Sequence, residues 1–347
     1  MNTTNGPDVE DMGDDLILRV DNLRTYFGSG EKVAKSVDGV SFSVPRGKTV
    51  AVVGESGSGK SVTNLSIMGL LAKQGRIVGG SIQYRNREGQ VADLTVLSAK
   101  QMQAMRGREI AMIFQEPMTS LNPLYTVGQQ IEEMIKLHET IGTAERRARV
   151  RKLLELVEIP DAGRRVNEYP HQMSGGMRQR VMIAMALACN PRLLIADEPT
   201  TALDVTIQAQ ILDLLRRLQI DLGMSVLFVT HNLGVVAEIA HDVVVMYAGR
   251  VVEQAPVDAL FARPKHPYTK GLLACLPGAQ HGAKPHGEKP LLRPIPGSVP
   301  LVTNLPPGCS FAARCDLASA LCTRDPGPAL SVCGEGRLSR CWHHISL

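Results

Sequence analysis

The sequence predicts an α/β fold with a largely parallel central sheet, and two observations carry this prediction. Short apolar runs that suit strands buried on both faces stand at 49–53, 193–196, 225–229 and 243–246. Longer stretches with helical periodicity, such as 208–219, separate these runs. Because parallel strands need long crossover connections, usually helices, this alternation is typical of a parallel sheet.

The elements at the start of the chain can be placed in order. Apolar residues within 17–23 mark a first strand, and residues 37–44 mark a second strand that the turn 45–47 closes. The compact apolar run at 49–53 follows, and after a glycine-rich loop the pattern at 62–71 is helical. Residues 49–71 are therefore expected to form a strand–loop–helix unit.

These elements divide the chain into three parts. Residues 1–15 are polar and acidic and are expected to form a disordered tail. Residues 16–260 contain the strand–helix alternation, with a mostly helical block at about 116–190 that is expected to form a lobe beside the sheet. Residues 261–347 differ because prolines crowd the stretch 285–307 and disfavour helix and central strand. This last part is expected to be an extension in which a linker leads into a cysteine cluster.

Composition excludes several classes of protein. The 347 residues are 44% hydrophobic and 21% charged, which is ordinary for a soluble globular chain. The formal net charge of +4 is spread along the chain, so no basic cluster indicates nucleic-acid binding. No apolar stretch is long enough to span a bilayer, and the acidic start is unlike a signal peptide. The chain is therefore expected to stay in the cytoplasm and to reach a membrane only through a partner.

A glycine-rich loop stands between the strand at 49–53 and the helix at 62–71. It matches the phosphate-binding pattern G-x-x-x-x-G-K-[ST] with Gly54, Glu55, Ser56, Gly57, Ser58, Gly59, Lys60 and Ser61. The glycines let backbone N–H groups turn towards phosphate oxygens, and the helix start adds partial positive charge. Lys60 is expected to contact the outer phosphates of ATP, and Ser61 to bind Mg²⁺. Because a strand and a helix flank the loop, a chance match is disfavoured, and the sequence predicts a P-loop NTPase.

An apolar strand further along the chain ends in two carboxylates, Asp197 and Glu198. Asp197 is expected to hold Mg²⁺, and Glu198 to polarise the water that attacks the phosphate. The alternative is a strand end whose acids are simply solvated. If the sequence held only these two acids, that alternative would be equally good. It is disfavoured because a phosphate loop precedes them in the chain.

The segment Met173-Ser174-Gly175-Gly176-Met177-Arg178-Gln179-Arg180 narrows the class of ATPase. It resembles the signature motif of ABC ATPases. The other landmarks of that family follow in order, because Gln115 resembles the Q-loop, Asp204 the D-loop and His231 the switch histidine. The resemblance covers roughly residues 16–260. It implies a RecA-like core with an antiparallel β edge and an inserted helical subdomain that carries the signature.

The resemblance also implies an ATP site shared by two chains. Ser174, with the two glycines after it, would face the γ-phosphate of an ATP molecule held by a second ATPase subunit, in a head-to-tail dimer. Gln115 would sense Mg²⁺ and the attacking water, and His231 would contact the γ-phosphate. Asp204 would order the dimer interface. Closure of the dimer on ATP and its opening after hydrolysis would drive transport.

The resemblance further implies that the adenine ring stacks on an aromatic residue that precedes the phosphate loop. Phe27 is the preferred residue, with Tyr26 close behind it. The alternative for either residue is a core aromatic on a strand, and the sequence leaves both interpretations open.

Several features are similar to the oligopeptide/dipeptide importer branch of the family. Met173 and Met177 replace the usual Leu and Gln of the signature, while its serine and both glycines are intact. The segments 115–123, 266–269 and 295–315 are also similar to that branch. This implies uptake of di- or oligopeptides, two membrane-spanning permease subunits, an extracytoplasmic peptide-binding protein, and a position on the cytoplasmic face of the membrane. The second ATPase subunit could be identical or a sister chain.

Five of the seven cysteines lie in the last part of the chain. The resemblance implies a [4Fe–4S] cluster, as in some members of the branch, on Cys309, Cys315, Cys322 and Cys341. Four thiolates suit such a cluster or Zn²⁺, and thiols without metal are the third interpretation. Cys333 is additional and could replace one ligand. The other two, Cys189 and Cys275, are expected to be small buried residues.

Other functions keep part of this assignment. The same ATPase could serve transport of nickel, glutathione or antimicrobial peptides. A chromosome-maintenance or DNA-repair ATPase would carry a long coiled coil before the signature, but the stretch 115–174 is too short and has no sustained heptads. A translation-factor ABC protein would carry two nucleotide-binding units, and this chain has one.

Overall fold

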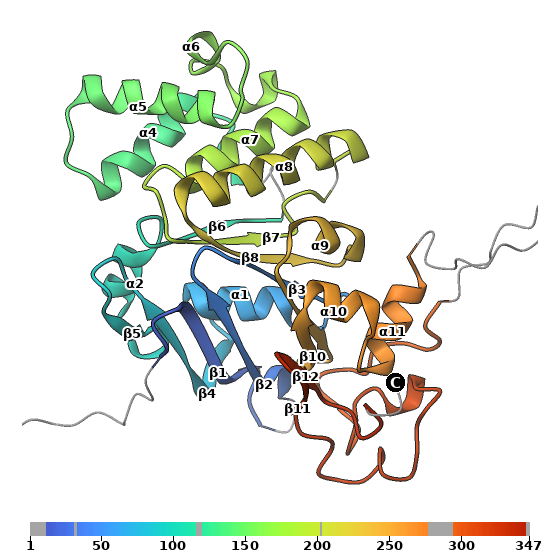
Figure 1. The fold of residues 1–347 in the computed structure, drawn as a ribbon. Helices are drawn as coiled ribbons and strands as arrows, with labels where there is room; N and C mark the ends of the chain where they lie inside the picture. The colour runs from blue at the N-terminus through green and yellow to red at the C-terminus, as the bar shows by residue number, and fades with distance from the viewer. Residues whose placement is uncertain (1–11, 31–32, 116–119, 202, 277–293, 345–347) are drawn as a thin grey trace, which may run out of the picture.

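Two sheets form the framework of the chain (Figure 1). The computed structural model describes residues 12–30, 33–115, 120–201, 203–276 and 294–344. Within these residues one sheet has four strands and the other has eight. A helical lobe lies at one end of the molecule, and the four-stranded sheet lies towards the other (Figure 1). The C-terminal segment, by which we mean the described residues after position 260, also lies towards that other end. No helix in the described part of the chain combines the length and the apolar character that a membrane crossing needs.

The smaller sheet is antiparallel, with the strand order β2-β1-β4-β5. Its strands are β1 (Leu16–Phe27), β2 (Ala34–Pro45), β4 (Gly75–Arg85) and β5 (Val91–Asp93). The two strands predicted at the start of the chain are therefore present, and both are longer than their apolar runs. Residues 12–15, placed in the predicted tail, form a turn in which the N–H of Leu16 donates to the carbonyl of Gly13 at 3.0 Å.

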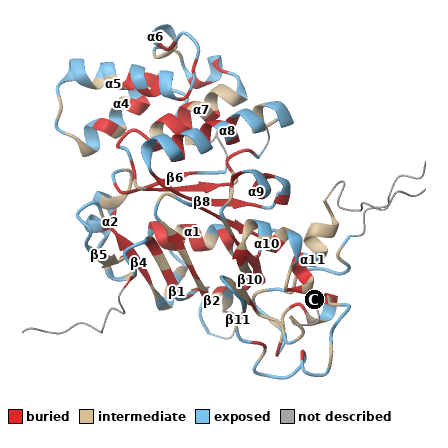
Figure 2. Cartoon of the chain, viewed as in Figure 1, coloured by how far each residue is buried: buried red, intermediate tan, exposed pale blue. Residues whose placement is uncertain are grey.

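The larger sheet confirms the α/β prediction, because five neighbouring strands, in the order β9-β3-β8-β7-β6, are parallel. These strands are β3 (Thr49–Val53), β6 (Ile110–Ile113), β7 (Leu193–Asp197), β8 (Ser225–Thr230) and β9 (Asp242–Tyr247). Every residue of β3, β7 and β8 is buried, as expected for strands covered on both faces (Figure 2). The carboxyl ends of these strands meet at one edge of the sheet, where the glycine-rich loop and the two carboxylates also stand.

Helices α1 (Lys60–Met68) and α2 (Ala99–Met105) belong to the region between and beside the two sheets. Ile67 and Met68 of α1 share one apolar cluster with residues of both sheets, so α1 packs between them. The helix ends where Gly69 adopts a left-handed conformation with φ 60°, a backbone state that favours glycine. The predicted helix at 62–71 therefore begins and ends slightly earlier than its apolar pattern.

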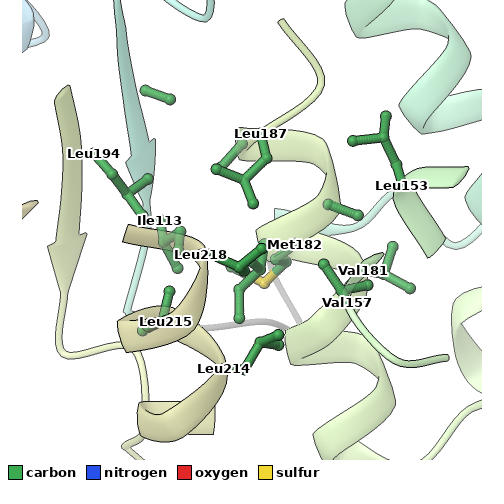
Figure 3. Close-up of a cluster of buried hydrophobic side chains, with 14 of the residues drawn as sticks. Ile113, Leu153, Val157, Val181, Met182, Leu187, Leu194, Leu214, Leu215 and Leu218 are labelled. Atoms are coloured by element: carbon green, nitrogen blue, oxygen red, sulfur yellow. The ribbon is translucent and has the colours of Figure 1, made fainter. Parts of the chain in front are cut away.

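The helical lobe contains α4 (Val127–His138), α5 (Thr143–Leu156), α6 (Ala162–Arg165) and α7 (Gly175–Ala186), and α8 (Val205–Leu222) packs beneath it (Figure 1). Thr126 begins α4 with a capping box, in which its side chain and that of Gln129 each accept a backbone N–H bond. Figure 3 shows Met182 of α7 beside Leu218 of α8, in the same apolar cluster as Leu194 and Ile113 of the sheet. This shared core fixes the lobe to the β6–β8 side of the sheet.

The chain continues through α9 (Leu233–Ile239), β10 (Arg250–Pro256), α10 (Val257–Ala262) and α11 (Pro267–Ala274), and later forms β11 (Ser331–Gly334) and β12 (Arg337–Ser339). Strand β12 pairs with β10, so the last part of the chain extends the large sheet at its edge. The described part of the predicted linker, 294–307, contains neither helix nor strand. It packs against the core, because Ile295, Val299 and Leu305 contact the same apolar cluster as Tyr247 and Tyr268.

Candidate functional site

The phosphate loop joins β3 to α1, and its shape depends on glycine. Gly54 and Gly59 have φ values of 155° and 98°. A Cβ atom at either position would collide with a backbone carbonyl, of Met246 for Gly54 and of Ser36 for Gly59. The side chain of Lys60 folds back over the loop, and its Nζ donates to the carbonyl of Gly54 at 2.7 Å and to that of Glu55 at 3.1 Å. The loop is thus closed around the amine that is expected to contact phosphate.

Two residues from distant parts of the sequence and one close neighbour converge on Glu198. Gln115 Nε2 donates to Glu198 Oε2 at 3.0 Å, and His231 Nδ1 lies 3.1 Å from Glu198 Oε1. Thr201 also donates its hydroxyl to Oε2, at 3.1 Å. Burial raises the pKa of Glu198, but the His231 and Thr201 hydrogen bonds outweigh this effect, and the net pKa is below its ordinary value. Glu198 is therefore an ionised carboxylate at neutral pH.

Asp197 differs from Glu198 in burial and in its pKa. The residue is 5% exposed, and its Oδ1 has no hydrogen-bond partner among the described residues. Burial raises its pKa above the ordinary value, although Ser61 and Asn64 beside the carboxylate oppose the shift. A buried carboxylate oxygen without a donor, next to a serine hydroxyl, suits a hard cation such as Mg²⁺, which prefers oxygen ligands. These residues therefore fit the predicted metal.

The loop and the Glu198 group face one cavity of about 560 Å³. Its lining residues are Val53, Gly54, Glu55, Ser56, Gln115, Glu198, Thr201, His231, Leu233 and Leu272. Leu272 belongs to α11, so the part of the chain after residue 260 borders the site. A cavity of this size with phosphate-binding and carboxylate groups at one sheet edge defines a P-loop ATPase.

The signature residues lie elsewhere on the chain. Ser174 begins α7 and accepts the N–H of Met177 at 3.4 Å, and both Ser174 and Gly175 are exposed. Gly176 allows α7 to approach α8, because a Cβ atom there would come within 2.8 Å of Ile207. Asp204 begins α8 by accepting the N–H of Ile207 at 2.9 Å. Within one chain, none of these residues lines the cavity at the phosphate loop.

The two candidates for adenine stacking have different surroundings. The hydroxyl of Tyr26 donates to Asp38 at 2.7 Å, and burial together with this bond raises the Tyr26 pKa to about 12. The ring of Phe27 lies directly beside Gly75, where a Cβ atom would contact it at 2.6 Å. Both residues are partly exposed at the end of β1. Adenine stacking on Phe27 stays a prediction.

The predicted cysteine ligands come together in part. Cys309, Cys315, Cys322 and Cys341 line one small cavity, with Trp342 and His343 also on its wall. None of the four forms a disulfide, and burial raises the pKa of Cys309, Cys315 and Cys341, the last to about 11. The described residues contain no group of three or more His, Cys, Asp or Glu side chains arranged to hold a metal ion. The structure therefore gives the predicted cluster no direct support.

The remaining cysteines are less uniform than predicted. Cys189 is buried, and its thiol lies 3.6 Å from the carbonyl of Met134, as expected for a small core residue. Cys275 is only half-buried. Cys333 stands on β11, outside the cavity of the other four thiols.

Two residues that the sequence did not assign to the site contact the phosphate loop. The hydroxyl of Tyr268, in α11, accepts the N–H of Glu55 at 2.9 Å. Arg314 donates to both carboxylate oxygens of Glu55 at 3.1 Å. Both residues lie in segments that resemble the importer branch, but no local pattern indicated that either would reach a loop more than 200 positions earlier.

Comparison with known proteins agrees with the fold and the site. The family model "ABC transporter" matches residues 37–201, and "Oligopeptide/dipeptide transporter, C-terminal region" matches residues 252–322. A putative peptide import ATP-binding protein of Brucella ovis is 55% identical over 95% of this chain and 98% of its own length. The oligopeptide transport ATP-binding protein AppD of Bacillus subtilis is 51% identical over 94% of this chain and 96% of its own.

Solved structures extend the comparison to three dimensions. The dimeric structure of MJ0796, a bacterial ABC transporter cassette, covers 70% of this chain and 99% of its own, with 29% identity and a TM-score of 0.61. CbiO1 of Clostridium perfringens, part of the transporter complex cbiONQ, covers 72% of this chain and 91% of its own, with 28% identity and a TM-score of 0.61. The chain belongs to the ABC transporter ATPase family, in the group that carries the oligopeptide/dipeptide transporter C-terminal region.

Proposed function

We propose that this chain is the ATP-hydrolysing subunit of an importer that brings di- or oligopeptides across the cell membrane, bound to permease subunits at the cytoplasmic face. The observation that carries the ATPase part is the convergence of Gln115 and His231 on the Glu198 carboxylate beside the phosphate loop. The names of the peptide-import relatives and the matched C-terminal region support the cargo. Nickel, glutathione and antimicrobial peptides are the alternative cargoes.

The ATP phosphates would lie in the loop, with Lys60 and the start of α1 facing their negative charge. Ser61, Asp197 and Gln115 would hold Mg²⁺, and the Oδ1 of Asp197, which has no hydrogen-bond partner among the described residues, is the atom that such a cation would satisfy. When bound, the metal supplies positive charge that neutralises the phosphate oxygens. The protein's own share is to fix the phosphates and the attacking water in line.

Glu198 is the group that would act on the attacking water. Its lowered pKa keeps it ionised, and hydrogen bonds from Gln115 and Thr201 on one oxygen and His231 on the other fix its orientation. An oriented carboxylate can accept a hydrogen bond from water and thereby align a lone pair of the water oxygen with the γ-phosphorus. His231, which is 61% exposed at its side chain, stands on the open side where it can reach the γ-phosphate.

The second half of the site would come from another ATPase subunit. Ser174 and Gly175 are exposed and absent from the cavity wall within one chain, so they are free to face a nucleotide held by a partner. The N-terminal end of α7 carries the partial positive charge that suits a γ-phosphate. A head-to-tail dimer of this kind has two equivalent ATP sites.

Mixing two inactive variants of the full-length chain tests this arrangement. Lys60→Ala and Ser174→Arg should each abolish ATP hydrolysis in a dimer of identical chains. In mixed dimers one site carries both substitutions and the other carries neither. With random mixing we expect roughly a quarter of the wild-type turnover to return, because half of the dimers are mixed and each has one intact site of two. Mixtures that stay inactive, with dimer exchange confirmed by differently tagged chains, would refute the shared site.

The cargo is tested on the complex purified with its membrane partners. ATP hydrolysis by the complex in lipid vesicles should rise when di- or oligopeptides and the external binding protein are added. Stimulation by nickel or glutathione, with no response to peptides, would replace the peptide assignment without affecting the ATPase assignment.

We also propose that Cys309, Cys315, Cys322 and Cys341 hold a [4Fe–4S] cluster. The support is their donor chemistry and their position around a single cavity, since four thiolates are the ligand set of such a cluster. ATP hydrolysis needs no electrons, so the group would be structural or redox-sensing. By binding one group, the four cysteines would fix the fold of the segment between residues 309 and 341.

Iron and acid-labile sulfide analysis of anaerobically purified chain decides this point. We expect about four of each per chain, as a [4Fe–4S] cluster requires. Cys315→Ser should lose the iron, and the matched control Cys333→Ser should retain it, because Cys333 does not line the cavity. Zinc without iron would favour the alternative metal. The absence of both iron and zinc would show that the thiols bind no metal.

A further inference from the structure

The C-terminal segment touches the phosphate loop through the side chain of Arg314. This residue ends the short 3₁₀ helix Ala312–Arg314, and its side chain is only 6% exposed. Its Nη1 donates to both oxygens of the Glu55 carboxylate at 3.1 Å and to the Tyr247 hydroxyl at 3.2 Å. A charged group buried to this extent is usually paired, and here the partner is a residue of the loop.

A second contact reaches the main chain at the same position. The hydroxyl of Tyr268 accepts the N–H of Glu55 at 2.9 Å, and Tyr268 is fully buried. Its ring packs against Tyr247 and Phe311, with centroid distances of 4.7 and 5.4 Å. The hydroxyl is therefore held in place by an aromatic cluster that the C-terminal segment completes.

Arg314 is itself anchored from behind. Its Nε donates to the carbonyl of Pro296 at 2.8 Å, and its Nη2 donates to that of Ile295 at 3.4 Å. These carbonyls belong to the stretch between α11 and the cysteines. Because Nε and Nη2 of the guanidinium bond to the segment and Nη1 bonds to Glu55, the position of the segment and that of the loop are coupled.

Glu55 is a sensitive point of the phosphate loop. It follows Gly54 directly, and its carbonyl accepts a hydrogen bond from Lys60 at 3.1 Å. Its side chain, its N–H and its carbonyl are thus all engaged, the first two by residues after position 260. A shift of this peptide would move the Lys60 amine and the backbone groups that surround the phosphates.

We propose that Arg314 and Tyr268 are positioning residues that hold the phosphate loop in its nucleotide-binding conformation, so that ATP affinity depends on the C-terminal segment. This inference rests on ATP being the ligand of the loop, and it is independent of the cargo and of any metal at the cysteines. Neither residue touches the nucleotide cavity itself, so both act through Glu55.

Equilibrium titration of the full-length chain with a fluorescent ATP analogue and Mg²⁺ tests the proposal. Arg314→Met should weaken binding about tenfold, equal to ~1.4 kcal/mol, because Glu55 loses its buried partner. Arg314→Lys, which keeps the charge but not the fork of donors, should recover part of the affinity. In a Glu55→Gln background the further loss caused by Arg314→Met should shrink to less than about twofold, since the partner carboxylate is already gone.

The matched control is Arg340→Met. Arg340 lies in the same segment, and its guanidinium donates to the carbonyls of Val251 and Pro328, at 2.8 and 3.3 Å, without reaching the loop. It should bind the analogue like the wild type. If Arg314→Met also binds like the wild type, or if its loss is equally large with Glu55→Gln, the positioning role is wrong. A wild-type chain that binds no ATP would instead refute the proposed function.

Discussion

The nucleotide site and the cysteine cavity are built in different ways. The nucleotide groups stand at the ends of parallel strands and at the start of α1, where ladder hydrogen bonds fix the backbone on both sides. The four cysteines themselves stand on irregular chain, and the regular elements between them are one short 3₁₀ helix and the small hairpin β11–β12. Hydrogen bonds along the strands therefore fix the positions of the nucleotide groups. The four thiols share a cavity but depend on turns and side-chain packing for their positions, and among the described residues they are not arranged to hold a metal ion.

The largest expected effect tests the nucleotide site. Glu198→Gln removes the charge that orients the attacking water but keeps the shape of the side chain. Turnover should fall by roughly 10²- to 10⁴-fold, the usual contribution of a general base. Binding of Mg-ATP should be retained, because Glu198 is not one of the groups expected to hold the phosphates. We therefore expect a closed dimer trapped with ATP, measured by steady-state hydrolysis and by size-exclusion chromatography with and without ATP.

The control for this variant is Glu158→Gln. Glu158 is also a partly exposed carboxylate bonded to two other side chains, Arg180 and Arg217, but it lies in the helical lobe. Its substitution should leave turnover unchanged. Normal turnover in Glu198→Gln, or an equal loss in both variants, would remove Glu198 from its assigned role.

A second prediction concerns the contact between the antiparallel sheet and strand β10, which pairs with β12 of the C-terminal hairpin. Arg250 in β10 donates to Asp38 in β2 at 2.7 Å, and Tyr26 donates to the same carboxylate. Burial raises the pKa of Asp38, but the hydrogen bonds from Arg250 and Tyr26 outweigh it, and the net pKa is lowered. Asp38→Asn should reduce stability by about 2 kcal/mol at pH 7, the scale of a hydrogen bond to a charged group.

The pH dependence gives this prediction its sign. The unfolded chain takes up a proton at Asp38 near the ordinary pKa of 3.8, whereas the folded chain does so only at lower pH. The stabilisation is therefore fully present above that value and is lost as the pH falls through the lowered pKa. Thermal unfolding should show a melting temperature for Asp38→Asn that is roughly 4 °C below wild type at pH 7, with the gap closing towards pH 3. Asp14→Asn, which changes a fully exposed carboxylate beside Arg85, should show no such gap, and a gap of equal size there would contradict the assignment.

The same contrast explains what the sequence could predict. The phosphate loop and the acidic strand end are contiguous motifs, and the loop requires glycine for a local reason, since a Cβ at Gly59 would strike the carbonyl of Ser36. The partners of Glu198 are different, because Gln115 lies 83 positions away and His231 lies 33. Only the family resemblance suggested that they would meet there.

Other contacts could not be predicted from local sequence patterns. The Arg314–Glu55 pair spans 259 positions and joins an irregular segment to a loop, so no periodicity marks either residue. The arrangement of the four cysteines is set by turns around residues 308–327 and by packing on Phe311, and spacing alone does not encode it. Long-range contacts between irregular segments are therefore the part of this molecule that required a structure.

The smallest expected effect tests whether the two regions are linked through the main chain as well as through Arg314. Tyr268→Phe keeps the aromatic packing but leaves the N–H of Glu55 without its acceptor. A single neutral hydrogen bond contributes about 0.5–1.5 kcal/mol, so Mg-ATP affinity should fall about threefold. Tyr84→Phe is the matched control, because Tyr84 is equally buried but bonds to Glu109 in another part of the fold. If both variants weaken binding alike, the effect is one of general stability, whereas a loss confined to Tyr268→Phe shows that the loop senses the segment through its backbone.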